Sequence, residues 1–343
     1  MPYKPLFTIN PDILRRLETI QHLHTRIQDA AIKLTALPLM QKDVVVRSAH
    51  GSSAIEGNPL TLEEARTTLE GKDIPAATRR SIKEIQNAAE AIKYIQRHGD
   101  ARLIRESDVF KIHSLLGAGD ALDRGPIGAY RDYGVRVGNH IAPHASDVPH
   151  YMRELLDWLN GDAGQWPAVV SSAVLHFRFE FIHPFGDGNG RTGRILAAWE
   201  LYRRKFDSQH IFAMDETLWD HRPKYYAALD QAQQGLEQDL SRWIEFMTEM
   251  LEITLERTWK RIEEIRGGAA TEKVHLTPRQ EKLLRILRAG PLRPTELQKE
   301  LDLTRGGLHY LLKPLLRAGL VGREGGYKTG VYRIPDAGDT AGI

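Results

Sequence analysis

The stretch that most restricts how this chain can fold is residues 181–194, Phe-Ile-His-Pro-Phe-Gly-Asp-Gly-Asn-Gly-Arg-Thr-Gly-Arg. An apolar helical run over residues 168–181 leads into it and must stop at Pro184, because the proline ring clashes with the preceding turn. Alternating glycines then let backbone N–H groups turn toward one point and form a nest for anions. A helical segment over residues 191–205 follows, so its N-terminus faces the same point. The pattern predicts a phosphate-binding loop between two helices.

Four side chains give this predicted phosphate site the means for chemistry. Arg191 and Arg194 lie three residues apart, on one face of a first helical turn, where acids are usual and two arginines favour an anionic ligand. His183 has an ordinary pKa suited to accepting a proton near neutrality. Asp187 offers an oxygen to a divalent cation that also binds phosphate. Taken singly, each residue fits a Gly-rich surface turn, but the combination indicates phosphoryl or nucleotidyl transfer.

The motif over residues 183–194 resembles the signature of the Fic (Fido) family, with no position substituted. That family consists largely of enzymes that transfer AMP from ATP to hydroxyl side chains of target proteins. The resemblance implies that His183 is the catalytic base. It also implies that Asp187 binds Mg²⁺, or Mn²⁺ in its place, and that Phe185 anchors the loop in the core.

The same resemblance implies how the loop would bind ATP. Asn189 and the loop amides are assigned to the α- and β-phosphates, Arg191 to the β-phosphate and Arg194 to the γ-phosphate. The expected ATP-binding residues of the motif are Asp187, Gly188, Asn189, Gly190, Arg191, Thr192, Gly193 and Arg194.

The composition is that of an ordinary globular protein, with 41% hydrophobic and 27% charged residues. A length of 343 residues has room for two or three domains. The chain has no cysteine, which excludes disulfides and thiolate zinc sites. Its first residues contain no apolar signal segment, and no run approaches the ~20 apolar residues of a membrane span. We therefore expect a cytoplasmic protein that does not enter a membrane.

A second motif covers residues 52–57, Ser-Ser-Ala-Ile-Glu-Gly. Gly57 and the Asn-Pro that follows are turn residues, so a short helix is expected to end just after Glu56. Thr61 and Glu64 then form a capping box for the next helix. A carboxylate in the last turn of a helix meets the unfavourable end of the dipole, so Glu56 is either solvated or paired elsewhere.

The spacing Ser52-x-x-x-Glu56-Gly57 resembles the inhibitory motif of Fic proteins that carry an inhibitory helix before the catalytic core. By that resemblance Glu56 pairs with Arg194 and occupies the guanidinium that would hold the γ-phosphate. ATP would then bind in a pose unfit for in-line attack. An arginine–carboxylate pair is a strong, charge-assisted contact, which makes the arrangement physically sound.

The rest of the first 265 residues reads as helices with one hairpin. Helical periodicity covers residues 11–37, 76–104 and 240–264. Residues 135–137 alternate and Gly138-Asn139 is a hairpin turn signal. An isolated hairpin is marginal in water, so it is either incidental or has a purpose.

In the Fic family a hairpin flap at this position binds the target peptide by strand addition. The resemblance therefore implies a flap over residues 134–149 on which a target protein docks. The expected residues that close over the nucleotide are Val137, Gly138, Asn139 and His140.

Two adjacent tyrosines, Tyr225 and Tyr226, lie in a later helical stretch. They either flank an adenine base or belong to the core, which is usual for aromatics at helical spacing. The resemblance places both near the nucleotide, together with Gln233, which stands where the family often has Asn.

The C-terminal segment predicts a second domain of three helices followed by two short strands. Residues 277–334 contain twelve Lys and Arg against five Asp and Glu, a net charge of +7, so the remainder must carry −5 to reach the total of +2. The element order resembles a winged helix-turn-helix, and the basic charge favours contact with DNA phosphates through Thr304, Arg305, His309 and Lys313. Dimerisation or protein docking is the alternative.

The sequence thus predicts a mainly α protein: a Fic-type helical core with a β-hairpin flap, plus a C-terminal winged-helix domain. The expected division is an N-terminal helical region at 1–95, a catalytic core at 96–265, a linker at 266–275, a winged helix at 276–335 and a tail at 336–343. The expected function is a protein adenylyltransferase that uses ATP and Mg²⁺ and is inhibited by Glu56. Removal of AMP by the same site and a nucleotide-sensing, DNA-binding regulator are the alternatives. A homodimer is a further partner that the sequence leaves open.

Overall fold

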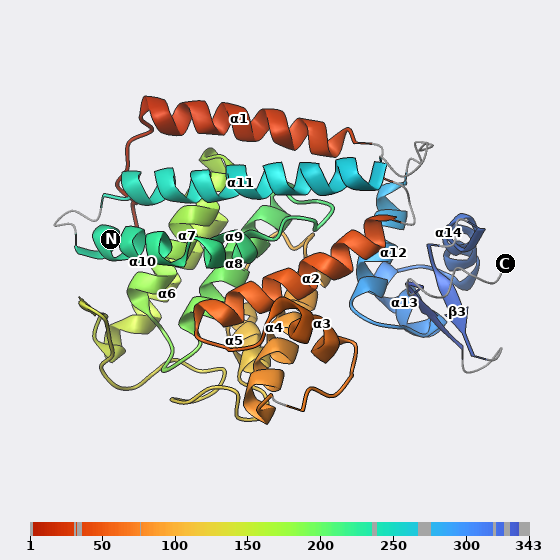
Figure 1. Cartoon of the computed structure of the whole chain (residues 1–343), viewed down its shortest axis with the longest axis horizontal. Helices are drawn as coiled ribbons and strands as arrows, with labels where there is room; N and C mark the ends of the chain where they lie inside the picture. Colours follow the sequence, from red (N-terminus) through yellow and green to blue (C-terminus); the bar gives the residue numbers. More distant parts are fainter. Residues whose placement is uncertain are drawn as a thin grey trace.

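The computed structural model of the chain is mainly helical, with two short antiparallel strand pairs in the part described (Figure 1). It describes residues 3–30, 32, 36–75, 77–234, 239–266, 276–317, 320–325 and 330–335. Within these ranges, no helix is both long enough and apolar enough to cross a membrane. The predicted mainly α class is confirmed.

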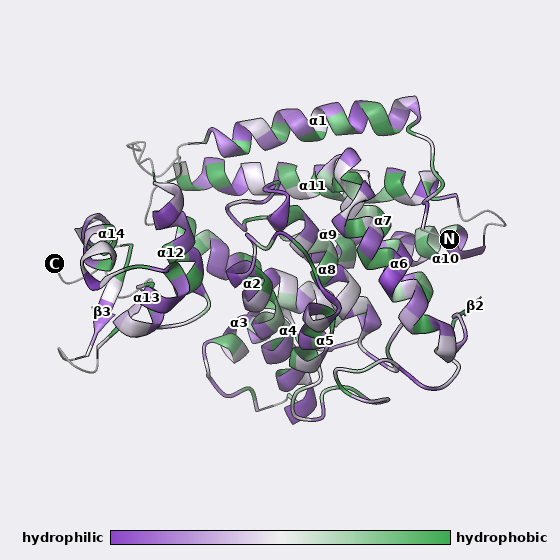
Figure 2. Ribbon diagram, turned by 180° about the vertical axis from the view of Figure 1, so that it is seen from behind, coloured by the Kyte–Doolittle hydropathy of each residue, from purple (hydrophilic) through white to green (hydrophobic). Residues whose placement is uncertain are grey.

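Two helices lie side by side along one edge of the molecule: α1, Pro11–Gln28, and α11, Ser241–Arg266 (Figure 1). Hydrophobic and hydrophilic bands alternate along both, as expected of helices with one buried face (Figure 2). The prediction of one helix over residues 11–37 is wrong, because α1 ends earlier and α2 occupies Ala36–Ile55. Pro38 suits the first turn of a new helix, which is where the structure has it.

The centre of the molecule is a pair of helices on either side of the signature loop. α7, Ala168–Ile182, is buried along nearly its whole length, and α8, Asn189–Arg203, packs against it. The helices packed around this pair include α4, Arg79–Arg97; α5, Glu106–Leu116; and α6, Val148–Asn160. One hydrophobic core extends from Ile13 to Met250, so the segments 1–95 and 96–265 pack as one body.

A second group of helices brings the N-terminal motif to the signature loop. Its members besides α2 are α3, Leu62–Leu69; α9, Met214–Asp220; and α10, Arg222–Gln234. The expected capping box of Thr61 and Glu64 begins α3. α2 crosses α9 so closely that a Cβ at Gly51 would lie 2.5 Å from the carbonyl oxygen of Asp215. A glycine at position 51 therefore sets the distance between these two helices.

The expected hairpin is present but shorter than predicted. β1, Arg136–Val137, pairs antiparallel with β2, His140–Ile141. Gly138 has a φ of +57°, which its turn requires and which glycine adopts without strain. The predicted extent of 134–149 is too long, because a 3₁₀ turn begins at Ala145 and leads directly into α6. We call residues 134–142 the flap.

The C-terminal part of the chain has a hydrophobic core of its own. Its elements are α12, Pro278–Arg288; α13, Pro294–Leu301; α14, Arg305–Arg317; and the paired strands β3, Gly322–Glu324, and β4, Val331–Arg333. The predicted three helices and two strands are all present. We call this part the C-terminal module.

The C-terminal module rests on the larger body through α12, which packs against α4. An ion pair of 2.6 Å between Arg285 and Asp100 lies at this contact. Of the predicted linker, residue 266 ends α11, and residues 267–275 lie outside the described residues, as does the predicted tail at 336–343.

Candidate active site

α7 turns into the signature loop at His183. This residue caps the helix in a left-handed conformation with a φ of +49°, and its N–H still donates to the carbonyl of Phe179. Gly188, with a φ of +77°, is the left-handed residue that begins α8. α8 therefore starts at Asn189, two residues earlier than predicted. The loop and the N-terminus of α8 form one compact turn, as the motif predicts.

Phe185 and His113 anchor the loop from the inside. Phe185 is fully buried and stacks on the imidazole of His113, with 3.7 Å between ring centres. His113 Nδ1 accepts a hydrogen bond from Gly128 N–H, so its Nε2 carries the proton and donates to the carbonyl of Asp187 at 3.0 Å. The anchoring expected of Phe185 fits this packing. Sequence reasoning misses His113, whose only signal is a histidine in a predicted helix.

Three motif residues support the loop with side chains or close contacts that face inward. The buried amide of Asn189 exchanges two hydrogen bonds with the backbone of Phe185, both at 2.9 Å. Thr192 Oγ1 donates to a loop carbonyl at 2.8 Å. A Cβ on Gly193 would lie 2.6 Å from the carboxyl of Glu180. These contacts give Asn189, Thr192 and Gly193 a role in the shape of the loop.

The side chain of His183 is 14% exposed at the edge of the loop. Burial, reinforced by the positive charge of Arg131, lowers the pKa of His183 to about 4. The imidazole is therefore neutral near pH 7, which is the state that a general base requires. Its Nδ1 atom is buried and lies 3.8 Å from the carboxyl of Glu180, which leaves Nε2 as the ring nitrogen that a substrate can reach.

Glu180 is a buried acid that sequence reasoning does not identify. Burial raises the pKa of Glu180 to about 8, although the charge of Arg194 opposes the shift. Its carboxyl is therefore mostly protonated at pH 7. The available signal is a single acidic residue within the apolar run at 168–182.

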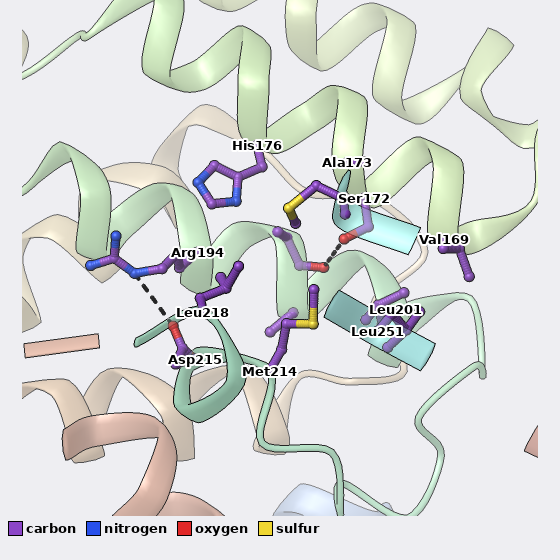
Figure 3. Close-up of a pocket in the computed structure, with 13 residues that line it drawn as sticks. Val169, Ser172, Ala173, His176, Arg194, Leu201, Met214, Asp215, Leu218 and Leu251 are labelled. Carbon is purple, nitrogen blue, oxygen red and sulfur yellow. Dashed lines mark hydrogen bonds and ion pairs between the residues drawn. The ribbon is translucent and has the colours of Figure 1, made fainter. Parts of the chain in front are cut away.

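Arg194 is buried in the first turns of α8 and surrounded by partners. Its guanidinium donates to Ser52 Oγ at 3.0 Å, to the Ser52 carbonyl at 2.9 Å and to Glu56 Oε1 at 2.8 Å. Asp215 adds an ion pair at 3.4 Å (Figure 3). Burial opposes the charged form, but the carboxylates, Glu56 first, outweigh it and raise the pKa of Arg194. The expected Glu56–Arg194 pair is confirmed, whereas Asp215 is a partner that the sequence does not indicate.

Glu56 lies just beyond the C-terminus of α2 instead of in its last turn. The predicted short helix is wrong, because α2 has 20 residues and ends at Ile55; Gly57, with a φ of +96°, follows in the turn. A Cβ on Gly190 would lie 2.2 Å from Glu56 Oε1, so this carboxylate touches the first turn of α8. Helix N-termini favour anions. Glu56 thus occupies both the guanidinium and the helix end that were expected to hold phosphate.

A cavity of about 30 Å³ lies beside Arg194 and has room for roughly one or two water molecules (Figure 3). Arg194, Asp215 and His176 are among the residues that line it. His176 forms a hydrogen bond of 3.0 Å with the hydroxyl of Tyr225, and burial lowers the pKa of His176 to about 3. Tyr225 is buried and packs in the hydrophobic core, which is the second of the two roles that the sequence left open for it.

Tyr226 and Gln233 lie in different surroundings on α10. Tyr226 is 42% exposed, and its hydroxyl donates to the carbonyl of Ile55, next to Glu56. Gln233 lies in the last turn of α10 and is partly exposed. The structure therefore places Tyr226 next to Glu56, while Tyr225 is a core residue bonded to His176.

Asp187 supplies a partly exposed carboxylate on the loop. One oxygen accepts from Gly188 N–H at 2.5 Å and the other from Asp123 N–H at 2.7 Å, and the guanidinium of Arg191 lies 3.7 Å away. Within the described residues, no three His, Asp or Glu side chains gather as metal ligands. Mg²⁺ does not need such a cage when it keeps waters and takes oxygens from phosphates. The donor set fits a cation that arrives with a nucleotide.

The flap residues differ in what they contact. His140 is buried, and its Nε2 forms a hydrogen bond of 2.8 Å with the carbonyl of Phe181. Val137, Gly138 and Asn139 at the tip are exposed. His140 therefore ties the flap to the end of α7, close to His183, and the tip is open to a partner or a nucleotide.

Comparison with known proteins gives a consistent family for this site. Residues 103–201 match the Fic/DOC family. The chain is 31% identical over 237 residues to a protein adenylyltransferase Fic from Nematostella vectensis, with 66% of this chain and 52% of that protein covered. A protein of the same name from Aedes aegypti is 30% identical over 253 residues, with 71% and 47% covered. The chain thus spans about half the length of these curated relatives.

Solved structures agree with the sequence match. A Fic family protein from Desulfovibrio desulfuricans is 28% identical, with a TM-score of 0.65 and 98% of this chain and 99% of that chain covered. A fragment of Fic-1 from C. elegans, at 23% identity, shares the fold over 74% of this chain and 73% of its own, with a TM-score of 0.64. The matched segment 103–201 includes the flap, His183 and the first turns of α8. The chain therefore contains a Fic/DOC family domain, and the signature loop lies within it.

Proposed function

We propose that this protein transfers AMP from ATP to a Ser, Thr or Tyr hydroxyl of a target protein, and that Glu56 restrains the transfer. One arrangement carries the proposal: a neutral His183 stands beside a helix N-terminus whose Arg194 is already held by a carboxylate. The relatives named protein adenylyltransferase support the reaction class.

In the proposed reaction, Nε2 of His183 accepts the proton of the target hydroxyl while its oxygen attacks the α-phosphorus of ATP. The bond from the α-phosphorus to the bridging oxygen breaks, and pyrophosphate leaves. The loop amides, the N-terminus of α8 and Arg191 face the phosphates and stabilise the developing charge. Mg²⁺ or Mn²⁺ held by Asp187 would supply further charge neutralisation on the phosphate oxygens.

The flap is proposed to hold the target by strand addition. Ile141 on β2 is 73% exposed and Val137 on β1 is 41% exposed, so the flap offers apolar side chains to a partner. A two-stranded hairpin also has unpaired backbone groups along its outer edges. These features support a flap that receives an extended segment of the target protein.

The proposed inhibition of AMP transfer by Glu56 follows from competition between Glu56 and ATP for Arg194. A γ-phosphate needs this guanidinium and the helix end beside Gly190, and Glu56 occupies both. A hydrogen bond to a charged group is worth about 1.5–3 kcal/mol, which corresponds to roughly 10- to 100-fold in an equilibrium. Removal of the carboxylate is therefore expected to release the site by about that factor.

The test is labelling of lysate proteins with α-labelled ATP and Mg²⁺ by wild type, Glu56→Gly and the double variant Glu56→Gly/His183→Ala. We expect weak labelling by wild type, about 10- to 100-fold more by Glu56→Gly, and none by the double variant. Equilibrium binding of ATP to both variants is the control, because the alanine removes the base and keeps the phosphate site. A folded Glu56→Gly variant that binds ATP and labels nothing would contradict the proposal.

Removal of AMP by the same site is the second candidate. The carboxylate of Glu56 is 34% exposed beside Arg194, so it is placed to orient an attacking water. The proteins labelled in the first assay serve as substrates. Loss of label that needs Glu56 would favour this reaction. A nucleotide sensor without catalysis is disfavoured, because it has no use for the base His183.

We further propose that the C-terminal module is a winged helix-turn-helix that contacts DNA phosphates through α14. Its net charge of +7 and the exposed face with His309, Tyr310 and Lys313 support this, and Tyr310 is 82% exposed. Anisotropy titrations of the full chain with duplex DNA at two salt concentrations test it. The logarithm of affinity is expected to fall by roughly 0.9 per phosphate contact per decade of salt, and Lys313→Glu to weaken binding. No binding at low salt would leave docking or homodimerisation as the role of the module.

A further inference from the structure

Arg131, which sequence reasoning does not single out, connects the flap to the catalytic turn. The residue is buried, with 2% of its surface exposed. Its guanidinium donates to the carbonyls of His183 at 2.8 Å and Ile182 at 3.3 Å, which end α7. It also donates to the carbonyls of Tyr133 at 2.8 Å and Pro143 at 2.7 Å, which stand at the two ends of the flap. One side chain thus joins both ends of the flap to the backbone of the base.

This arrangement is costly, which argues for a specific purpose. Within the described residues, no ion pair with a carboxylate accompanies the Arg131 guanidinium, and burial lowers the pKa of Arg131. A buried charge is tolerated when its donors are satisfied, and here four carbonyl oxygens accept from it. The planar fork of arginine can reach carbonyls on two sides at once, which the single ammonium of a lysine cannot do equally well.

The contacts fall where the backbone needs support. His183 has a left-handed φ of +49°, and such a conformation costs on the order of 1 kcal/mol in a residue other than glycine. Arg131 holds the carbonyl of this residue, and its own N–H donates to the carbonyl of Pro184 at 2.9 Å. The side chain of Arg131 therefore holds the carbonyl of His183, and its backbone N–H holds the carbonyl of the next residue.

The charge of Arg131 also acts on the imidazole. Burial is the largest cause of the lowered pKa of His183, and Arg131 is the next. The other groups that face the imidazole are His140 from the flap, which lowers its pKa further, and Glu56 from the end of α2, which raises it; the carboxyl of Glu180 on α7 lies 3.8 Å away. Loss of the positive charge at position 131 is therefore expected to raise the pKa of His183.

We propose that Arg131 is a positioning residue that fixes the flap and the backbone of His183 to each other, so that a hydroxyl held on the flap meets the base at a constant distance. The kinetic assay of this proposal rests on the proposed function, whereas the contacts of Arg131 are independent of it. The expected loss from a misplaced base is about 100-fold in kcat, since displacements of about 1 Å have effects of that size. The KM for ATP is expected to stay unchanged, because Arg131 contacts only the first residues of the signature loop, Ile182 to Pro184, and none of residues 187–194 that are proposed to hold the phosphates.

The experiment uses the full chain in the Glu56→Gly background and compares Arg131→Lys, Arg131→Met and Arg15→Met. Arg15 is an exposed arginine of α1, with 72% of its side chain accessible, so its variant is the matched control. Initial rates of label transfer to lysate proteins are measured against ATP concentration and pH. Arg131→Met is expected to lose about 100-fold in kcat and to move its acid limb to higher pH. Arg131→Lys keeps the charge, so it is expected to lose kcat and keep the parent acid limb.

The outcomes separate the two proposals. A parent that transfers no AMP contradicts the proposed function, and NMR titration of the His183 imidazole, assigned by its loss in His183→Ala, then decides on Arg131. A raised pKa in Arg131→Met with an unchanged pKa in Arg15→Met supports the role of Arg131. Parent-like kcat in folded Arg131→Lys, or an unchanged His183 pKa in Arg131→Met, overturns it. If Arg131→Met does not fold, the kcat of Arg131→Lys decides.

Discussion

His183, the proposed base, is kept neutral over the physiological pH range by burial. With a pKa of about 4, His183 is deprotonated at every pH well above that value. Glu56 raises the pKa of His183, so its loss lowers that pKa further, and the rate of AMP transfer by Glu56→Gly is expected to stay level down to about pH 5 and to fall only at about pH 4 or below. Initial rates measured beside far-UV circular dichroism, which reports unfolding, check this. A midpoint near the ordinary histidine value of about 6.5 would contradict it.

A second residue-scale prediction concerns the contact between Gly190 and Glu56. A Cβ at position 190 would lie 2.2 Å from Glu56 Oε1, so Gly190→Ala forces the carboxylate aside. Overpacking of this kind typically costs about 1–3 kcal/mol. In urea unfolding, Gly190→Ala is expected to destabilise the wild-type chain by about that much and the Glu56→Gly chain by clearly less. Equal losses in both backgrounds would show that the two residues do not press on each other.

The candidate site residues that the sequence brings together are those within one continuous motif. His183, Asp187, Arg191 and Arg194 follow from spacing and chemistry over twelve positions. Asp215 cannot be predicted from the sequence, because its ion pair with Arg194 joins α9 to α8 and no local sequence pattern indicates that contact. The same holds for Arg131, whose four carbonyl partners come from two separate segments.

At the scale of elements, the flap is notable for apolar side chains that are exposed to solvent and make little contribution to the core. Ile141 is 73% exposed, so Ile141→Asp is expected to change the free energy of unfolding by no more than about 0.5 kcal/mol. It is expected to lower the rate of transfer to proteins several-fold, while ATP binding stays unchanged. Leu14→Asp, at a 53% exposed position of α1, is the matched control. Equal transfer rates for the two variants would remove the flap from target binding.

Element boundaries show what sequence patterns miss. The periodic stretch at 11–37 divides into two helices, and the helix before Glu56 is much longer than predicted. Both differences arise from α2, which is buried on most sides and so lacks the alternation that marks a surface helix. The turn residues locate the hairpin, but the predicted extent of 134–149 runs past it into a 3₁₀ turn at Ala145–Asp147 and the first residues of α6.

At the scale of the whole molecule, the C-terminal module is attached to the body that contains the site without supplying residues to it. A chain that ends at residue 268 is therefore expected to keep AMP transfer in the Glu56→Gly background. It is expected to melt a few degrees lower, because α12 no longer covers α4. The contribution of the Arg285–Asp100 pair is about 1 kcal/mol or less, since Asp100 is 40% exposed. Differential scanning fluorimetry and the labelling assay measure both, and a folded but inactive truncation would contradict the separation.

The charge split in the sequence predicts the C-terminal module as a separate unit, and its own hydrophobic core agrees. The packing of α12 on α4 could not be predicted from the sequence. The contact depends on a few residues such as Arg285, and the sequence around Arg285 resembles that of any basic helix. The sequence also does not indicate that residues 1–95 and 96–265 share one core. The boundary between them was placed by the positions of the motifs, which do not show which helices pack together.

The left-handed backbone of His183 places stability and activity in direct opposition. Asn and Gly adopt a φ near +49° more readily than His, so either would relieve the turn. A library screened only for heat resistance would therefore enrich Asn or Gly at this position and discard the proposed base without any visible loss of fold. Variants chosen for catalytic use need selection on product formation at every round, and this histidine is the first codon to exclude from randomisation.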